Sequence, residues 1–238
     1  MHEWARAGDG LAGTEPASSL MICRERRFMF VHVPRTGGQS VERALFPSHS
    51  FSDREDPRHL YGWNASFGWL NHLSVQESRA GGFVTPVLAR RLFSFAFVRN
   101  PWDRLVSEYA WKFPDDCVSF HDFVSAIAGR EDHRVIGRYR SLRAYEQHVR
   151  PQADYVIDQG GRSSVDFVGR WEKLQAGFRE VCRYIGAPCI RLPHLNSSCR
   201  GPYADYYDRE SRMLASQVYA VDIARFGYSF RNERSTGA

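Results

Sequence analysis

Two runs of apolar residues stand out in the chain, at residues 28–33 and 92–98. Both are almost continuously hydrophobic and rich in Phe and Val, which is typical of strands buried on both faces of a parallel sheet. A shorter run at residues 165–168 fits a third strand. Segments of helical character follow these runs, and this order predicts an α/β domain with a mainly parallel sheet.

Turn and capping residues mark where the helices should begin and end. Pro101 fits the first position of a helix, Gly186 a helix C-cap and Asp208 a helix N-cap. Residues 48–70 show no clean period and are expected to form a long loop region, and the arginine-rich residues 130–164 indicate no clear element. Helices are predicted at residues 40–46, 101–112, 120–128 and 172–185, and after Asp208, with Leu214, Val218 and Val221 on one face.

Composition places the chain among ordinary globular proteins. Its 238 residues are 43% hydrophobic and carry a net charge of +5, which fits one domain with a full-sized core. Arginine supplies nearly all of the positive charge, since Lys112 and Lys173 are the only lysines. Arginine suits forked contacts to phosphate and sulfate. No dense basic block with interleaved aromatic residues is present, which argues against a nucleic-acid partner.

The two ends of the chain show no sign of packing. We predict a loose N-terminal tail at residues 1–26, one domain at residues 27–230 and a C-terminal tail at residues 231–238. The first residues lack the apolar core of a secretory signal, and no run of about 18 apolar residues predicts a membrane span. The five cysteines include no C-x-x-C pair, so we expect neither a zinc site nor a disulfide framework.

The strongest chemical signal directly follows the first apolar run. The segment Pro34-Arg35-Thr36-Gly37-Gly38-Gln39-Ser40 places a basic residue, two hydroxyls and two glycines between a strand and a helix. Glycines let backbone N–H groups converge, and the helix N-terminus adds positive potential. The sequence therefore predicts a site for a phosphate or sulfate group. The segment is not a Walker A loop, because the G-x-x-x-x-G-K-[ST] order is missing.

A second basic motif follows the second apolar run. In Arg99-Asn100-Pro101-Trp102-Asp103-Arg104-Leu105-Val106-Ser107, Arg99 ends a strand and Ser107 lies two turns into the next helix. A strand-end arginine and a serine on the inward face of that helix can converge on one phosphate. Two anion sites about 60 residues apart would suit the two ends of one nucleotide.

Together, the two motifs resemble those of sulfotransferases that use 3′-phosphoadenosine-5′-phosphosulfate (PAPS). The likeness is to carbohydrate sulfotransferases related to the heparan sulfate 2-O-sulfotransferases and their bacterial relatives. In that family a His-x-Pro-Lys-Thr-Gly-Gly-x-Ser loop holds the 5′-phosphosulfate, and an Arg-Asn-Pro-[Tyr/Trp]-Asp-Arg-x-x-Ser motif holds the 3′-phosphate. Residues 32–40 and 99–107 match these motifs, and residues 168–174, 193–198 and 226–228 look like further landmarks.

The resemblance implies a P-loop-like three-layer domain with helices on both sides of the sheet. It implies that PAPS donates a sulfuryl group to a hydroxyl of a carbohydrate-like acceptor, leaving PAP and an O-sulfated product. No metal is expected, because a sulfuryl group has less charge than a phosphoryl group. The cofactor-binding residues implied are Arg35, Thr36, Gly37, Gly38, Gln39, Ser40, Arg99, Ser107, Ser198 and Arg200.

The catalytic residues expected from the resemblance are His72 and Arg35. His72 lies in a His-Leu-Ser segment between the two anion motifs and is the first choice for the base, with His49 and His59 as alternatives. His32 and His194 are expected to be structural. Position 35 is usually lysine in the family and is arginine here, which keeps the positive charge and changes the donor geometry.

Two other classes of function remain open at this stage. A nucleotide kinase would need a Walker lysine and a magnesium-binding Asp, and neither stands out. A non-catalytic PAP- or nucleotide-binding protein is the other alternative, which Arg35 supports. Aromatic residues and arginines at residues 58–70 and 130–150 favour an acidic sugar as acceptor. The expected location is the cytoplasm of a bacterium, or else the chain is a soluble domain without its membrane anchor.

Overall fold

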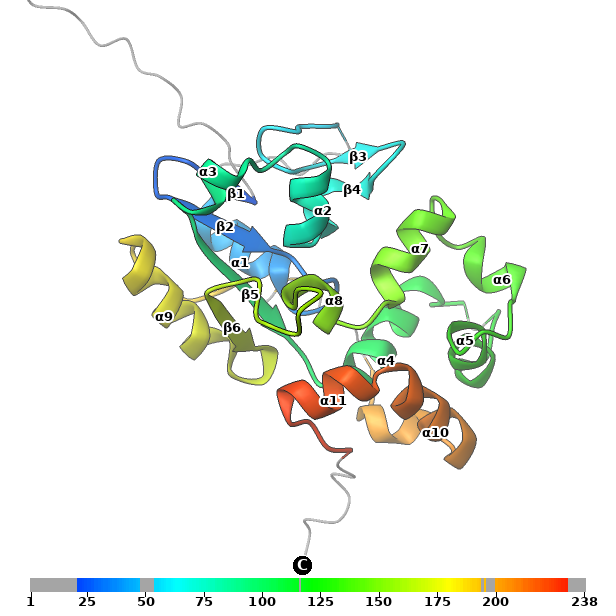
Figure 1. Cartoon of the computed structure of the whole chain (residues 1–238). Coiled ribbons are helices and arrows are strands. Elements are labelled where there is room, and N and C mark those ends of the chain that lie inside the picture. The colour runs from blue at the N-terminus through cyan, green and yellow to red at the C-terminus, as the bar shows by residue number, and fades with distance from the viewer. Residues whose placement is uncertain (1–20, 48–53, 116, 194, 196–199, 231–238) are drawn as a thin grey trace, which may run out of the picture.

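A four-stranded sheet lies at the centre of the protein (Figure 1). The computed structural model describes residues 21–47, 54–115, 117–193, 195 and 200–230. The strand order is β1 (Ile22–Cys23), β2 (Phe28–Val31), β5 (Phe93–Val98) and β6 (Phe167–Arg170). β2 pairs parallel to β5, and β5 parallel to β6. The mainly parallel sheet predicted from the three apolar runs is therefore confirmed.

Phenylalanine rings fill the centre of this sheet. Phe28, Phe30, Phe95 and Phe97 are at most 1% exposed. The rings of Phe30 and Phe95 stack across the β2–β5 pair with centroids 5.0 Å apart. Such pairs add to the burial of apolar area. The core explains why these two strands read as continuous apolar runs.

The first strand corrects part of the predicted N-terminal tail. Ile22 and Cys23 pair antiparallel with Met29 and Phe28, and Met21, Ile22 and Cys23 are buried. These residues therefore do not belong to the loose tail predicted at residues 1–26. A strand of two residues is too short to show an alternating pattern of apolar and polar positions. The exposed residues 24–27 that follow also separate it from the apolar run of β2.

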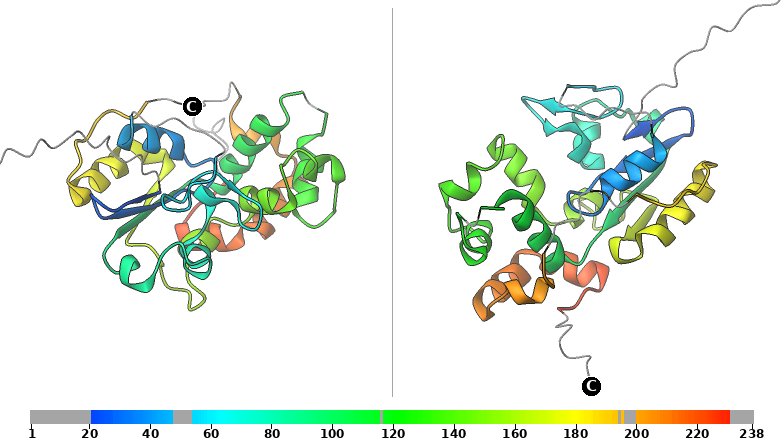
Figure 2. Two further views of the ribbon diagram at one scale, coloured as in Figure 1. Left: turned by 90° about the horizontal axis from the view of Figure 1, so that it is seen from above. Right: turned by 180° about the vertical axis from the view of Figure 1, so that it is seen from behind.

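Helices cover both faces of the sheet, as the two views of Figure 2 show. Helices α1 (Gly38–Leu45) and α9 (Leu174–Ile185) pack on one face, and α2 (Val75–Ala80) and α8 (Ala153–Val156) lie on the other. This is the expected three-layer arrangement. The predicted C-cap is confirmed, since Gly186 ends α9 with a φ of 63°.

A second group of helices packs beyond the sheet, beside the strand ends that lead into α4 (Figure 1). They are α4 (Pro101–Lys112), α5 (Phe120–Ile127), α6 (His133–Ile136), α7 (Leu142–Val149), α10 (Arg209–Val218) and α11 (Ala220–Phe226). They share an apolar cluster that includes Leu105, Phe123 and Tyr219. Asn100 caps α4, which begins and ends as predicted.

Short elements account for most differences from the sequence prediction. Within the expected loop region lie the hairpin β3 (Trp63–Asn64) and β4 (Gly68–Trp69) and the 3₁₀ turn η1 (Leu70–His72). The remaining short elements are α3 (Pro86–Ala89), η2 (Trp171–Lys173) and η3 (Tyr203–Tyr206). The last predicted helix is divided at Tyr219, and Val221 is 58% exposed instead of facing the core.

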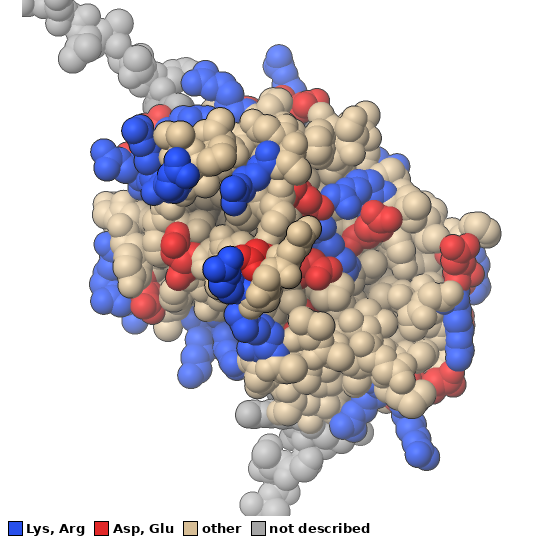
Figure 3. Space-filling view, viewed as in Figure 1, with Lys and Arg blue, Asp and Glu red and all other residues tan. Residues whose placement is uncertain are grey.

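The surface reflects the arginine-rich composition. Figure 3 shows basic side chains gathered at the end of the molecule that holds α3 and β1, and mixed with acidic ones elsewhere on this face. Within the described residues, no helix is long and apolar enough to cross a bilayer.

We predict that Asp222→Ala destabilises the fold by about 2–4 kcal/mol, because it leaves buried donors without acceptors. The Asp222 carboxylate is fully buried and accepts hydrogen bonds from the backbone N–H groups of Gln152 and Ala153, each at 2.8 Å. Urea unfolding measures the change. The control Glu131→Ala removes an exposed carboxylate and should change the unfolding free energy by less than about 0.5 kcal/mol. An equal change in unfolding free energy for Asp222→Ala and Glu131→Ala would contradict the structural role of the Asp222 carboxylate.

Candidate active site

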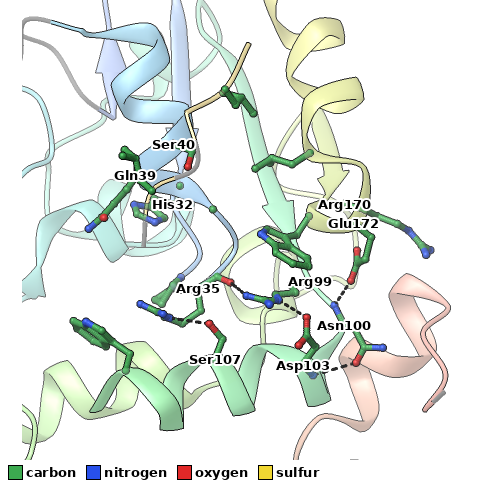
Figure 4. A pocket seen from close by; sticks show the side chains of 18 of the residues that line it. His32, Arg35, Gln39, Ser40, Arg99, Asn100, Asp103, Ser107, Arg170 and Glu172 are labelled. Atoms are coloured by element: carbon green, nitrogen blue, oxygen red, sulfur yellow. Dashed lines mark hydrogen bonds and ion pairs between the residues drawn. The ribbon is translucent and has the colours of Figure 1, made fainter. Parts of the chain in front are cut away.

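A large open cavity lies where β2, β5 and β6 end (Figure 4). The carboxyl ends of parallel strands are the usual ligand-binding edge of an α/β sheet. Most of the residues predicted from the two motifs line this cavity: Arg35, Gly37, Gly38, Gln39, Ser40, Arg99 and Ser107, together with His72 and Arg200. Segments far apart in the sequence thus form one site.

The loop between β2 and α1 requires its two glycines for different reasons. Gly37 has a φ of 83°, a conformation that residues with a side chain rarely adopt. Gly38 packs against the ring of His32, and a Cβ atom there would lie 2.0 Å from Nε2. The hydroxyl of Thr36 is fully buried and donates to the carbonyl of Val33 at 2.8 Å. Thr36 therefore fixes the loop with its side chain and can offer a ligand only its backbone.

Arg35 joins the first motif to the second. Its φ is 65°, and its Nε donates to the Ser107 hydroxyl at 3.3 Å (Figure 4). The same Nε lies 3.9 Å from the carboxylate of Glu108. Burial lowers the pKa of Arg35, while Glu108 opposes that change. A guanidinium remains charged under these conditions, so Arg35 presents a fixed positive charge at the cavity.

Arg99 is the second buried cation of the site. It is 5% exposed and donates through Nε to Asp103 at 2.7 Å and through a terminal nitrogen to the carbonyl of Arg35 at 3.1 Å. Its guanidinium lies 3.7 Å from the ring centre of Trp171. Burial lowers the pKa of Arg99 to about 10, so the side chain is still cationic at neutral pH.

Arg200 approaches the same carboxylate from a distant segment. It pairs with the other carboxylate oxygen of Asp103, and its side chain is 12% exposed. Asp103 thus holds two arginines at the cavity wall. Ser198, the other cofactor-binding residue predicted in this segment, lies outside the described residues, as does His194.

Three histidines surround the floor of the cavity. The ring centre of His72 lies 4.7 Å from that of His32 and 5.2 Å from that of His148. His72 donates through Nδ1 to the carbonyl of His32 at 2.9 Å. His32 Nδ1 lies 2.6 Å from the buried Glu42 carboxylate. Burial holds the pKa of His72 well below its ordinary value, and His32 and His148 lower it further.

The other sequence candidates are placed elsewhere. His59 pairs with Asp56 at 2.8 Å and does not line the cavity, and His49 lies outside the described residues. Trp102, which stands inside the second motif, belongs to the second apolar cluster and donates to Ser216 of α10 at 3.3 Å, so its role is to pack α4 against that helix.

Sequence reasoning missed several residues that line the cavity. His148 on α7, Trp111 and Lys112 on α4, and Lys173 after β6 all contribute to its wall. Both lysines of the chain are therefore at this site. No local motif distinguishes His148, which lies in a segment that showed no clear element. Among the described residues, no group of three His, Cys, Asp or Glu side chains is arranged to hold a metal ion.

Comparison with known proteins decides the family. A model of the Sulfotransferase family matches residues 18–229. The chain belongs to this family. The human carbohydrate sulfotransferase 14 is 23% identical to this sulfotransferase family member over 247 residues, covering 90% of this chain and 61% of the relative. The rat carbohydrate sulfotransferase 11 is 23% identical over 252 residues, covering 90% of this chain and 68% of the relative.

The similarity to these proteins is partial, both in the length that is matched and in sequence identity. This sulfotransferase family member spans about three-fifths of the length of the human relative, whose covered share is 61%. The crystal structure of a sulfotransferase from Alicyclobacillus acidocaldarius is similar over 84% of this chain and 93% of that chain, with 16% identity and a TM-score of 0.42.

We predict that Gly38→Ala disrupts the loop after β2, because the added methyl group would overlap the His32 ring. Overpacking of this kind costs about 1–3 kcal/mol, which thermal or urea unfolding measures. Gly201→Ala is the matched control, since Gly201 also lines the cavity but its Cβ would meet nothing within 4 Å. A stable Gly38→Ala protein would show that the loop does not need this close approach.

Proposed function

We propose that this chain is a PAPS-dependent O-sulfotransferase that acts on a carbohydrate-like hydroxyl. The observation that supports this most is the junction of the two motifs, where Arg35 contacts both Arg99 and Ser107. Two separate anion motifs that meet in one cavity suit a ligand with anionic groups at both ends.

The residues present fit such a ligand. Gly37 and Gly38 let the loop pack closely against Leu174 and the His32 ring, and the N-terminus of α1 begins at Gly38, where backbone N–H groups can face an anion. Arg35, with the backbone N–H groups up to Ser40, would hold the 5′-phosphosulfate. Arg99, Ser107 and Arg200 would hold the 3′-phosphate. When bound, PAPS would supply an activated sulfuryl group and a stable phosphate leaving group.

The protein's contribution is positioning and charge. Arg35 would stabilise the negative charge that builds on the bridging oxygen as the bond to sulfur breaks. Because its guanidinium is fixed by Ser107 and Glu108, little rearrangement would be needed at that moment. Arginine in place of the family's usual lysine would act as a permanent charge and not as a proton donor.

Transfer to a hydroxyl also needs a base. The sequence predicts His72, and its Nδ1–H bond to the His32 carbonyl leaves the lone pair on Nε2. His148 lines the same cavity. We propose that the base is one of these two histidines.

The acceptor side of the cavity combines aromatic and basic groups. Trp69 and Arg140 line it, and the Arg140 guanidinium lies 5.6 Å from the ring centre of Trp69 and 4.6 Å from that of Trp63. Gln147, fully buried, fixes the hairpin by accepting from the Trp69 backbone N–H at 2.9 Å. Aromatic faces suit sugar rings, and a guanidinium suits a carboxylate. We therefore propose an acidic sugar as the acceptor.

We expect calorimetry to show submicromolar to micromolar binding of PAP, with preference over ATP and Mg²⁺. Arg99→Ala should weaken PAP binding by about 10-fold to 100-fold, because it removes a charged hydrogen-bonding group worth about 1.5–3 kcal/mol. Arg130→Ala is the control, since Arg130 is 62% exposed and pairs with Glu210 away from the cavity. Preference for ATP with Mg²⁺ would instead favour a nucleotide kinase. PAP binding without any sulfate transfer would favour a non-catalytic binding protein.

For the acceptor, we expect labelled PAPS to sulfate unsulfated chondroitin faster than its carboxyl-reduced form. Arg140→Gln should raise the KM for chondroitin by about tenfold, which corresponds to about 1.4 kcal/mol. The KM for the carboxyl-reduced polymer should not change. Arg130→Gln serves as the control. Equal rates with both polymers would rule out recognition of a carboxylate.

A further inference from the structure

His148 is the histidine of the cavity that has a carboxylate partner suited to catalysis. Its Nδ1 lies 3.0 Å from Glu108 Oε1, and His148 itself stands 41 positions after Ser107, the last residue of the second motif. Glu108 is 1% exposed, and the hydroxyl of Tyr139 donates to the same carboxylate oxygen at 3.0 Å. Two donors thus fix this carboxylate in place.

The charge state of Glu108 follows from its neighbours. Burial alone would raise the pKa of Glu108, but His148, Arg35 and Lys112 outweigh it and hold the pKa below its ordinary value. Glu108 is therefore an ionised carboxylate at neutral pH. An ionised carboxylate can only accept hydrogen bonds, so neutral His148 must have its proton on Nδ1.

The other ring nitrogen of His148 is the reactive one. With Nδ1 protonated, Nε2 holds the lone pair, and Nε2 makes no hydrogen bond within the described part of the chain. The ring stacks on Trp111 with centroids 5.6 Å apart and planes 17° apart. Its orientation is thereby fixed from a second side. A base held in one tautomer and one orientation is the arrangement that general-base catalysis needs.

His72 lacks these features. Its Nε2 already lies 3.3 Å from the Asn71 amide nitrogen, and its Nδ1 faces a backbone carbonyl. Within the described residues no carboxylate forms an ion pair with His72. Protonation would create a buried cation without a counter-charge next to two other imidazoles, which is costly. The same proton on His148 would form an ion pair with Glu108.

Glu108 also connects this histidine to the cofactor loops. It directly follows Ser107 on α4, the residue to which Arg35 donates, and its second oxygen lies 3.9 Å from Arg35 Nε. The group that would take the acceptor proton and the group that would stabilise the leaving phosphate are therefore held by neighbouring residues of one helix.

Building on the sulfotransferase activity proposed above, we propose that His148, held by Glu108, is the base that takes the acceptor proton. The acceptor O–H bond breaks, and its proton goes to His148 Nε2. The acceptor oxygen then forms a bond to sulfur with its freed electron pair. The bond from sulfur to the 5′-phosphate oxygen breaks, and its electron pair leaves with PAP. His148 afterwards gives its proton to water, while His72 stays neutral throughout.

The surroundings of His148 contain one negative group that could stabilise a proton on its ring. The titratable and charged groups around it are Glu108, Arg104 and Lys112 from α4, His72 from η1, Tyr139 from the segment before α7 and Arg35 from the loop after β2. Only Glu108 among them is a carboxylate. Glu108→Gln therefore removes the counter-charge for the imidazolium that forms when His148 takes the acceptor proton, and the rate should fall.

The experiment compares PAP release from PAPS in the presence of unsulfated chondroitin for four variants. His148→Gln should lower kcat by roughly 10²–10⁴-fold and leave PAP binding by calorimetry unchanged. His72→Gln should lower kcat by less than about tenfold, as expected for one neutral hydrogen bond. Glu108→Gln should lower kcat and leave the KM for chondroitin unchanged. His121→Gln, which removes a histidine paired with Asp208 on the surface, should behave as wild type.

Other outcomes separate the two proposals. If His148→Gln keeps its kcat, or if His72→Gln loses more activity than His148→Gln, the base is not His148 although the sulfotransferase activity stands. A wild-type kcat for Glu108→Gln, or a change in the KM for chondroitin alone, would likewise overturn the role of the pair. If the wild-type protein neither binds PAP nor releases it from PAPS, the proposed function itself is wrong.

Discussion

The site depends on one contact, the hydrogen bond from the Arg99 guanidinium to the backbone carbonyl of Arg35 at 3.1 Å. It becomes possible because β2 and β5 are adjacent parallel strands, in register from Phe28 with Phe93 to Val31 with Ala96. Their carboxyl ends meet at one edge, so the loops that follow them meet as well. The contact joins the loop of the first motif to that of the second, and residues of both motifs line one cavity.

Buried charge is the constraint that this contact imposes. Arg35 and Arg99 both lie near the cavity floor with little exposure, and unpaired cations there would be costly. Two carboxylates on α4 offset them. Asp103 pairs with Arg99 and Arg200, and Glu108 lies near Arg35 and His148. Their spacing of five residues along α4 lets one helix supply counter-charges to both ends of the site.

Local sequence was sufficient for β2, β5 and β6, for α4 and for the two loops that carry the motifs, because these features depend on apolar runs, glycines and a proline read in order. It was insufficient where a role depends on distant partners. Ile22 needs Met29 to be a strand residue, and His148 needs Glu108, 40 positions earlier, to be held in one tautomer. Thr36 fits the motif, yet only the fold shows that its hydroxyl donates to the backbone carbonyl of Val33.

The arginine at position 35 illustrates how tertiary contacts change the meaning of a sequence departure. Read alone, its replacement of a lysine weakened the case for catalysis. In the fold, Arg35 Nε donates to the Ser107 hydroxyl and lies near the Glu108 carboxylate. The central carbon of its guanidinium lies 5.0 Å from the ring centre of Trp111, and its backbone carbonyl accepts a hydrogen bond from Arg99. A lysine has no planar fork to make such contacts together. The replacement therefore belongs with Ser107, Glu108 and Trp111 as one arrangement, in which a fixed guanidinium connects the loop after β2 to Glu108, the carboxylate that pairs with His148.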